Sequence, residues 1–399
     1  AEKERKNMLL SIALIMLAGM GFSLLCRKIK LPGLFGMVIV GILLGPYVLN
    51  LIDPSVLAIS AQLRKIALII ILARAGLTLN ISDLKKMGRP AILMCFLPAT
   101  FEMIGTVLLA PSLLHISIME AALLGAVIGA VSPAVIVPKM IRLIEEGYGT
   151  EKGIPQLILA GASADDVYVI VLFSTFTSLV QGGDVSVIRF VNIPVSVVLG
   201  ILAGLLCGAL LAVMFMKWEL TGTVKAIVFL CVCFLLSAAE DAISLPITFS
   251  SLIAVMFIGI AMQKKNGEDA RILSGKFNEL WKGAEVILFV LVGACVDISH
   301  LANAGASVLL LLAGALVFRM LGVWVCLLKT ALSGREKLFC MLSYTPKATV
   351  QAAIGGIPLA MGLPCGDTIL TVAVAAIMIT APLGAFAIDR TYQKFLTKN

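Results

Sequence analysis

"AVSPAVIVPKM" (residues 130–140) places two prolines and a serine in the middle of a long apolar run. "SYTPKATVQ" (residues 343–351) interrupts a second apolar run, far along the chain, in the same way. Proline has no backbone N–H to donate and clashes with the preceding turn, so each run is expected to be a helix that unwinds near its middle. The residues expected at these two interruptions are Ser132, Pro133, Pro138, Thr345, Pro346 and Lys347.

The composition is that of an integral membrane protein. Of the 399 residues, 60% are hydrophobic and 14% are charged, whereas soluble domains carry about 25% charged residues. Apolar runs of about 20 residues, enough to cross a hydrocarbon core about 30 Å thick, recur along the chain. We predict an all-α polytopic fold with about 13 transmembrane helices. The predicted spans cover residues 8–26, 33–52, 62–80, 90–112, 117–144, 154–181, 187–217, 223–240, 246–263, 277–299, 302–329, 334–360 and 365–388.

This number of spans divides into two sets of six that are joined by a linker helix. The second set would then be inverted relative to the first. Both interruptions fall in the fifth span of their set, which supports this inverted repeat. Either interruption alone could be a simple proline kink, but the matched pair favours crossed discontinuous helices. Opposed half-helix ends, buried in protein, suit an ion site.

The distribution of Lys and Arg predicts the orientation. With the predicted spans, most basic residues fall in the loops on the side of the C-terminus, which is therefore expected in the cytoplasm, with the N-terminus outside. The net charge of +8 is then a topology signal and no indication of nucleic-acid binding, because the basic residues are spread over short loops. We expect the bacterial cytoplasmic (inner) membrane as the location.

Five charged residues are expected near the bilayer centre within the predicted spans. Each one near the bilayer centre costs roughly 2.5 to 3.5 kcal/mol on insertion scales, so a functional role is expected. Glu102 and Arg319 occupy the fourth span of their respective halves, and we expect a salt bridge between them in the core. The five residues are Glu102, Asp165, Asp166, Arg319 and Lys347. Arg74, in a further span, is expected to have a scaffold role.

Two of these charges are adjacent in "GASADDVYVI" (residues 161–170). On a helix Asp165 and Asp166 point about 100° apart, so one can face a cavity while the other faces a packed helix or a cation. Ser163 lies on the same face as Asp166 and could join a coordination shell. A carboxylate in a low-dielectric site can hold a proton or a monovalent cation, but not both, which couples two opposite fluxes. A structural pair, satisfied by Arg319 and backbone donors, is the alternative for both carboxylates.

Three stretches, "GAVIGAVSPAVIVPKM", "YGTEKGIPQLILAGASADDV" and "YTPKATVQAAIG", resemble the monovalent cation/proton antiporter superfamily, in particular its sodium/proton antiporter branch. The resemblance implies that Asp166 binds Na⁺ or Li⁺ and H⁺ competitively, with Asp165 as its partner carboxylate and Ser132 beside the site. It also implies an elevator-like shift of a transport core against a scaffold, in a homodimer. Roles in pH homeostasis and salt tolerance are typical of this branch, and no resident cofactor is implied.

The implied division of the chain has five parts. Residues 1–88 and 221–300 would form the scaffold and dimerisation domain, residues 89–182 and 301–399 the transport core, and residues 183–220 the linker helix. In charge-moving relatives a lysine stands where this chain has Arg319. Arginine does not release its proton at usable pH, so that route to unequal stoichiometry is closed here.

Other classes of function have weaker support. A sodium-coupled symporter of organic anions could share this architecture, with Lys347 as its cationic clamp. A channel would need repeated selectivity groups along a pore, and the sequence has none. The sequence also shows no nucleophile paired with a base, and its nine cysteines and two histidines lack metal-ligand spacing, so we do not expect an enzyme.

Overall fold

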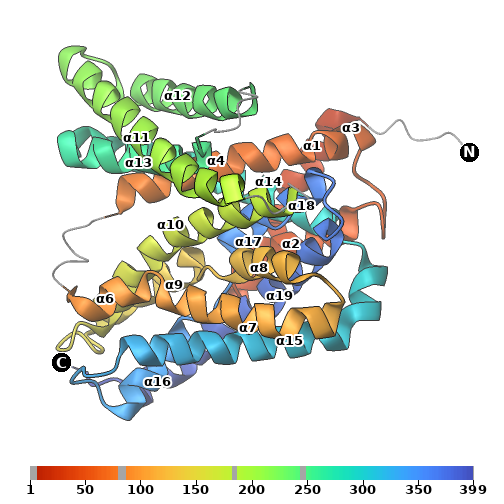
Figure 1. The fold of residues 1–399 in the computed structure, drawn as a ribbon, viewed down its shortest axis with the longest axis vertical. Coiled ribbons are helices and arrows are strands. Elements are labelled where there is room, and N and C mark those ends of the chain that lie inside the picture. Colours follow the sequence, from red (N-terminus) through yellow and green to blue (C-terminus); the bar gives the residue numbers. More distant parts are fainter. Residues whose placement is uncertain (1–6, 80–86, 182–186, 243–248, 399) are drawn as a thin grey trace, which may run out of the picture. The chain divides into compact units, whose positions relative to one another are not determined.

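The structure is a computed structural model that describes residues 7–79, 87–181, 187–242 and 249–398. Within these ranges the side chains of residues 163, 187–194 and 298–304 are not described. The described residues form helices and connecting loops without a β-strand, as Figure 1 shows. The all-α fold predicted from the apolar runs is therefore confirmed.

The helices follow one another with short connections, and several predicted spans consist of two or three helices. In chain order they are α1 (Met8–Lys28), α2 (Gly33–Leu44), α3 (Pro54–Ala58), α4 (Ser60–Thr78), α6 (Arg89–Met94), α7 (Leu97–Leu114), α8 (Ile118–Ile128), α9 (Pro133–Glu146), α10 (Ile154–Gln181), α11 (Val187–Lys217), α12 (Gly222–Ala242), α13 (Ser251–Lys265), α14 (Gly267–Ala294), α15 (Ile298–Cys326), α16 (Gly334–Ser343), α17 (Thr349–Ile354), α18 (Ile357–Ala360) and α19 (Gly366–Phe395).

Each predicted span contains at least one of these helices. Among the described residues, eight helical stretches are long and apolar enough to cross a membrane, and two further apolar helices are shorter. The exact number of thirteen crossings stays a prediction.

Two predicted span ends were wrong, and one span that was predicted as continuous is divided. The second span was expected to reach residue 52, but α2 ends at Leu44. The tenth was expected to begin at residue 277, but α14 begins ten residues earlier, with Glu268 and Asp269 in its first turn, where carboxylates are favourable. The fourth is split into α6 and α7, because Pro98 in the first turn of α7 cannot donate to the preceding turn.

The chain packs as two compact units. The first contains residues 1–64, 81–169 and 286–399, and the second contains residues 65–80 and 170–285. In the first unit α7 lies alongside α15 and α1 alongside α2; in the second, α11 packs on α13 (Figure 1). The division into scaffold and transport core that the family resemblance implies stays a prediction.

The contact between α7 and α15 depends on glycine. A Cβ atom at Gly322 would lie 2.9 Å from the Cα of Pro98 and 3.1 Å from the carbonyl oxygen of Leu97. The two helix backbones therefore approach each other more closely than a larger residue allows, as is common between membrane helices. This packing places Glu102 on α7 opposite Arg319 on α15.

Gly322→Leu is expected to destabilise the protein by about 1 to 3 kcal/mol, because the larger side chain forces α7 and α15 apart. The measurement is the thermal unfolding of the detergent-solubilised protein. Gly21→Leu on α1 is the matched control, since no described atom lies within 4 Å of its Cβ position. Equal unfolding temperatures for the two variants would contradict the close-packing argument.

Candidate functional site

The two proline-containing spans are interrupted, as the sequence predicts. One breaks between Ile128, the last residue of α8, and Pro133, the first residue of α9. The other breaks between Ser343, the last residue of α16, and Thr349, the first residue of α17. Both breaks lie in the first unit. A further similarity is that α8 and α16 each begin with a capping box, a Ser-x-x-Glu pattern (Ser117 with Glu120, Ser333 with Glu336) that satisfies the first amides of a helix.

The break after α8 frees three carbonyl groups that would otherwise lack partners. The Gln351 side-chain amide donates to the carbonyl oxygens of Ile128 (3.3 Å) and Ala130 (2.9 Å). The carbonyl oxygen of Gly129 accepts from the Arg319 guanidinium. Because the freed carbonyls carry the partial negative charge of a helix end, donors from other helices stabilise them.

The break also frees two backbone amides. The amide of Val131 donates to Asp165 Oδ2 at 2.8 Å, and the amide of Ser132 donates to the carbonyl oxygen of Pro346, also at 2.8 Å. The second of these bonds joins the two breaks directly. The unwound segments therefore cross beside the first of the paired carboxylates.

The second break is satisfied in a similar way. The amide of Lys347 donates to the Thr380 hydroxyl on α19, and the amide of Ala348 donates to Gln351 Oε1, both at 2.8 Å. Backbone groups inside a membrane protein are stable only with such partners. Gln351 thus stabilises both breaks. Its side-chain carbonyl accepts from a backbone amide in the second break, and its side-chain amide donates to two backbone carbonyls in the first.

Arg319 is the centre of a buried charge cluster. Its guanidinium binds Glu102 Oε2 at 2.7 Å and Asp165 Oδ2 at 3.0 Å, and donates to the carbonyl oxygen of Tyr344. Lys347 Nζ binds the same Glu102 oxygen. These four charged side chains are each at most 1% exposed, so their charges are stable only because they compensate one another.

The paired carboxylates have different surroundings. Asp165 is held by Arg319 and by the Val131 amide through one oxygen, whereas its Oδ1 has no hydrogen-bond partner among the described residues. Asp166 is 5% exposed, and the structure gives it no ion pair or hydrogen bond among the described residues; its Oδ1 is fully buried. Buried polar atoms without partners are uncommon and point to a proton, a water molecule or an ion.

A serine contributes a third buried oxygen without a partner. Ser132, fully buried at the break before α9, has no described hydrogen-bond partner for its hydroxyl. The Ser132 hydroxyl and the two carboxylate oxygens are hard oxygen donors, the type that alkali and alkaline-earth cations prefer. The Ser343 hydroxyl, at the end of α16, is also buried without a described partner. Ser163 belongs to α10, but its side chain lies outside the described residues.

Not all of the residues that were expected to interrupt the two spans lie in the two helix breaks. Pro346 lies in the second break and Pro133 starts α9. Pro138 was expected to interrupt its span, but it is exposed and lies inside α9, which continues past it; a proline there removes one backbone hydrogen bond and can kink a helix without ending it. Thr345 lies in the break, with its hydroxyl donating back to the Leu342 carbonyl.

The sequence analysis missed several groups that hold the site together. They are Gln351 as a bridge between the breaks, Thr380, and the backbone carbonyls of Gly129 and Tyr344. Gly161 on α10 allows the close approach of Tyr344, since a Cβ atom there would meet the Tyr344 hydroxyl at 2.5 Å. Of these, only the glutamine had a signal, as an uncharged polar residue within an apolar helix.

Gln351→Leu is expected to destabilise the fold by about 1 to 3 kcal/mol, because it leaves an amide and two carbonyls buried without partners. Thermal unfolding of the purified protein is the measurement. Gln393→Leu on α19 is the control, because this glutamine is exposed and binds only the Tyr392 hydroxyl. If both variants unfold at the wild-type temperature, Gln351 does not hold the two breaks.

Comparison with known proteins identifies this arrangement. The sequence pattern of "Sodium/hydrogen exchanger, transmembrane" matches residues 11–394. The chain belongs to the sodium/hydrogen exchanger family. It is therefore a multi-pass membrane protein of a transporter family, and the resemblance found in the sequence is confirmed.

Relatives of this exchanger-family chain occur in animals. It is 31% identical over 385 residues to sodium/hydrogen exchanger 9B2 of Mus musculus, with 92% of this chain and 69% of the relative covered. It is 32% identical over 359 residues to sodium/hydrogen exchanger 9B1 of Homo sapiens, with 85% and 67% covered.

A solved structure shares the fold. The sodium proton antiporter MjNhaP1 from Methanocaldococcus jannaschii at pH 8 superposes with a TM-score of 0.84 at 22% identity, covering 97% of this exchanger-family chain and 98% of the antiporter. A second structure of that antiporter gives a TM-score of 0.76 at 21% identity, with 98% and 99% covered.

Proposed function

We propose that the protein exchanges Na⁺ or Li⁺ for H⁺ across the membrane, with Asp166 binding the cation and the proton competitively. The observation that carries this proposal is the buried Asp166 carboxylate, which has no described partner, beside an Asp165 that is paired with Arg319. The names of the relatives and of the superposed antiporter refer to sodium and to hydrogen ions, which supports Na⁺ and H⁺ as the exchanged ions.

The net charge of the buried cluster supports the binding of one exchangeable ion, either a proton or a monovalent cation. Glu102 and Asp165 are matched by Arg319 and Lys347, and Asp166 is the fifth member. When all five are ionised the cluster carries one net negative charge, which is costly in a low-dielectric interior. Either a proton or a monovalent cation at Asp166 cancels it. Binding one therefore displaces the other.

The role of Asp165 would then be to complete the site. Its Oδ2 is fixed by Arg319 and by the Val131 amide, so the orientation of its free Oδ1 is set by the break between α8 and α9. Oδ1 and the Ser132 hydroxyl would serve as further ligands of the transported cation, and Ser163 is a candidate for another. The cation is the substrate, and we propose no resident metal.

Alternating access is proposed to be elevator-like. Residues 89–182 and 301–399 would move as the transport core, against a scaffold of residues 1–88 and 221–300 that forms a homodimer, with residues 183–220 as the linker. The crossed breaks would travel with the core as one body, because they bind each other and Asp165. The proposed orientation, C-terminus in the cytoplasm, follows from the Lys and Arg distribution. The location in a bacterial inner membrane is also a proposal; the exchangers 9B2 and 9B1, which are similar in sequence, are animal proteins.

The alternative of an organic-anion symporter loses its main support. Its clamp would be Lys347, but this ammonium is buried and bound to Glu102. Arg319 is likewise bound, to Glu102 and Asp165, and no further basic side chain within the described residues takes part in this buried charge cluster. We therefore retain exchange as the only proposed function.

The proposal is tested by reconstitution of the purified protein in proteoliposomes that contain a trapped pH-sensitive dye. Addition of NaCl or LiCl outside, with no organic solute present, should move protons out and make the interior more alkaline, in a saturable way. Choline chloride is the control for ionic strength. Sodium-22 uptake without any proton movement would overturn the proposal.

A further inference from the structure

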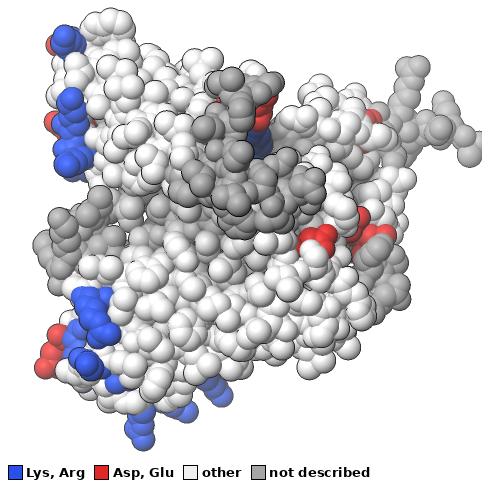
Figure 2. All heavy atoms as spheres, viewed as in Figure 1, with Lys and Arg blue, Asp and Glu red and all other residues white. Residues whose placement is uncertain are grey.

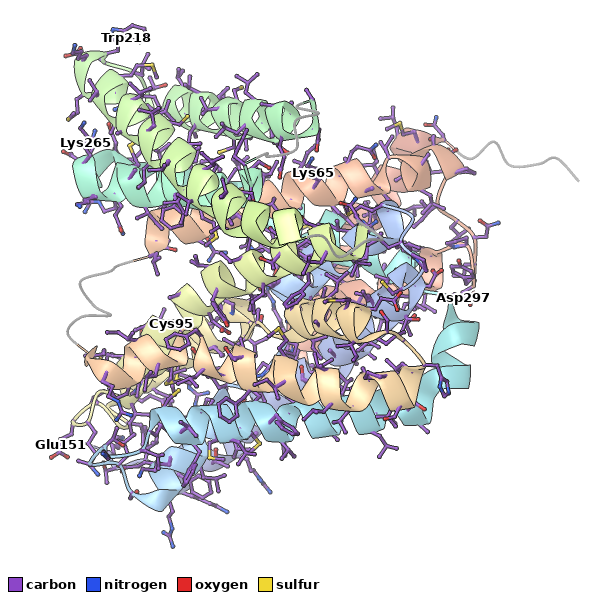
Figure 3. All side chains as sticks on the ribbon, in the orientation of Figure 1. Lys65, Cys95, Glu151, Trp218, Lys265 and Asp297 are labelled. Atoms are coloured by element: carbon purple, nitrogen blue, oxygen red, sulfur yellow. The ribbon has the colours of Figure 1, made fainter. Side chains whose placement is uncertain are left out.

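A groove lies on the second unit, well away in sequence from the charge cluster. Its volume is 480 Å³, and it is lined by Leu206, Ala209, Leu210, Val213, Met214, Lys217, Trp218 and Lys265. All but the last belong to the end of α11 and the residue after it, and Lys265 is the last residue of α13. Figure 3 shows Trp218 and Lys265 where these two helices end.

The groove is apolar along its length and basic at one end. Leu206, Leu210, Val213 and Lys217 recur at intervals of three or four residues and so share one face of α11. Leu206 and Leu210 are 62% and 61% exposed, so this face has no protein cover in the described chain. In a membrane protein such a face borders lipid or another protein.

The length of the apolar face fits one lipid leaflet. From Leu206 to Lys217 the helix rises about 16 Å at about 1.5 Å per residue. One half of a hydrocarbon core about 30 Å thick has nearly the same depth. The two lysines and Trp218 then mark the level of the headgroups, where tryptophan and lysine are enriched in membrane proteins.

The charge at this end favours an anion. Lys217 and Lys265 make no ion pair within the described residues, whereas the nearby Lys225 is bound to Asp269. Lys264 precedes Lys265 in the last turn of α13, so three lysines outside the Lys225–Asp269 pair stand against two carboxylates, Glu219 after Trp218 and Glu268 in the first turn of α14. Figure 2 shows basic side chains gathered at this end of the unit.

We propose that this groove binds one anionic glycerophospholipid, with the phosphate between Lys217 and Lys265 and an acyl chain along α11. Basic residues at the end of an apolar groove between transmembrane helices are suited to such headgroups. The site is independent of which ions the protein exchanges. The apolar length excludes a free phosphate ion as the natural occupant, because it would leave most of the groove uncovered.

The test uses Trp218 as its own reporter. The sequence has three tryptophans, and Trp281→Phe with Trp324→Phe leaves only the one at the groove. In nanodiscs of phosphatidylcholine, a small fraction of phosphatidylglycerol with brominated acyl chains should quench Trp218 strongly, and the same fraction of brominated phosphatidylcholine weakly.

Lys217→Gln with Lys265→Gln should lower the apparent affinity for the brominated phosphatidylglycerol by about thirtyfold, because each lysine near an anionic surface contributes about 1 kcal/mol and about 1.4 kcal/mol corresponds to tenfold in affinity. Arg271→Gln with Lys276→Gln, two exposed basic residues of α14, is the matched control and should change it little. Ala209→Phe, which fills the apolar part, should reduce quenching while the lysines remain.

Four results would overturn the proposal. Equal quenching by the two brominated lipids would remove the selectivity for an anionic headgroup, and selectivity that survives the two lysine changes would remove the site. Efficient disulfide cross-linking of two Leu210→Cys chains in the bilayer, without lipid quenching, would show that the groove is an interface between copies. Competition by soluble glycerol phosphate at low concentration would favour a free phosphate ligand.

Discussion

Asp166→Asn is expected to abolish cation-coupled proton movement in proteoliposomes. Asparagine neither gains nor loses a proton, so the variant has nothing to exchange. It also lacks the charge that holds the cation, and the loss of one charge-assisted ligand corresponds to roughly a hundredfold or more in affinity. The measurement is the initial rate of dye response after a NaCl or LiCl pulse.

Asp165→Asn is the matched control on the neighbouring residue. It keeps the titrating carboxylate but breaks the ion pair with Arg319, so exchange should be weakened or its charge coupling changed. Both variants should be purified in the same folded, monodisperse form as the wild type. Full activity in Asp166→Asn would contradict the assignment of the carrier residue.

Arg319→Gln should be the most destabilising single change in the cluster, because it leaves two buried carboxylates with one cation. Breaking a buried ion pair by removing one partner costs about 3 to 5 kcal/mol. The carbonyls of Gly129 and Tyr344 would lose a donor as well. The expected result is a large drop in unfolding temperature and in the yield of folded protein.

A second substitution separates charge balance from loss of contacts. Arg319→Gln combined with Asp165→Asn removes one charge of each sign, so the double variant should be more stable than Arg319→Gln alone. A coupling energy near zero in this double-mutant cycle would mean that the two residues do not compensate each other. Lys282→Gln, at an exposed pair with Glu279, should have little effect on stability.

Much of the fold could be predicted from the sequence, because the membrane restricts what apolar runs can do. Long runs without charges have to form helices in lipid, and prolines that fall at matching places in two runs indicate two interrupted helices. Five charges inside these runs were recognised as unusual for the same reason. The quoted stretches around Ser132, Asp166 and Pro346 then sufficed to place the chain in its family.

The tertiary structure decided how these charges are paired. Glu102 binds both Arg319 and Lys347, and Asp165 is fixed by Arg319 and by the Val131 amide. Sequence patterns could not show this, because the partners are far apart along the chain and each carboxylate had more than one basic candidate. They also could not show that α9 continues through Pro138, since a proline can either kink a helix or end it, and the pattern of residues does not distinguish the two.

Residue types and their spacing therefore determined the membrane class, the helices and the set of buried charges. Only the tertiary structure showed that Gln351 bridges both breaks, and that Asp166 alone has no described partner among the five charges. The physical reason is that burial makes a charge costly whatever its neighbours are, so the sequence reveals that a site exists. Whether a given carboxylate is paired with a basic residue or left without a partner depends on contacts between helices, which are set only when the chain folds.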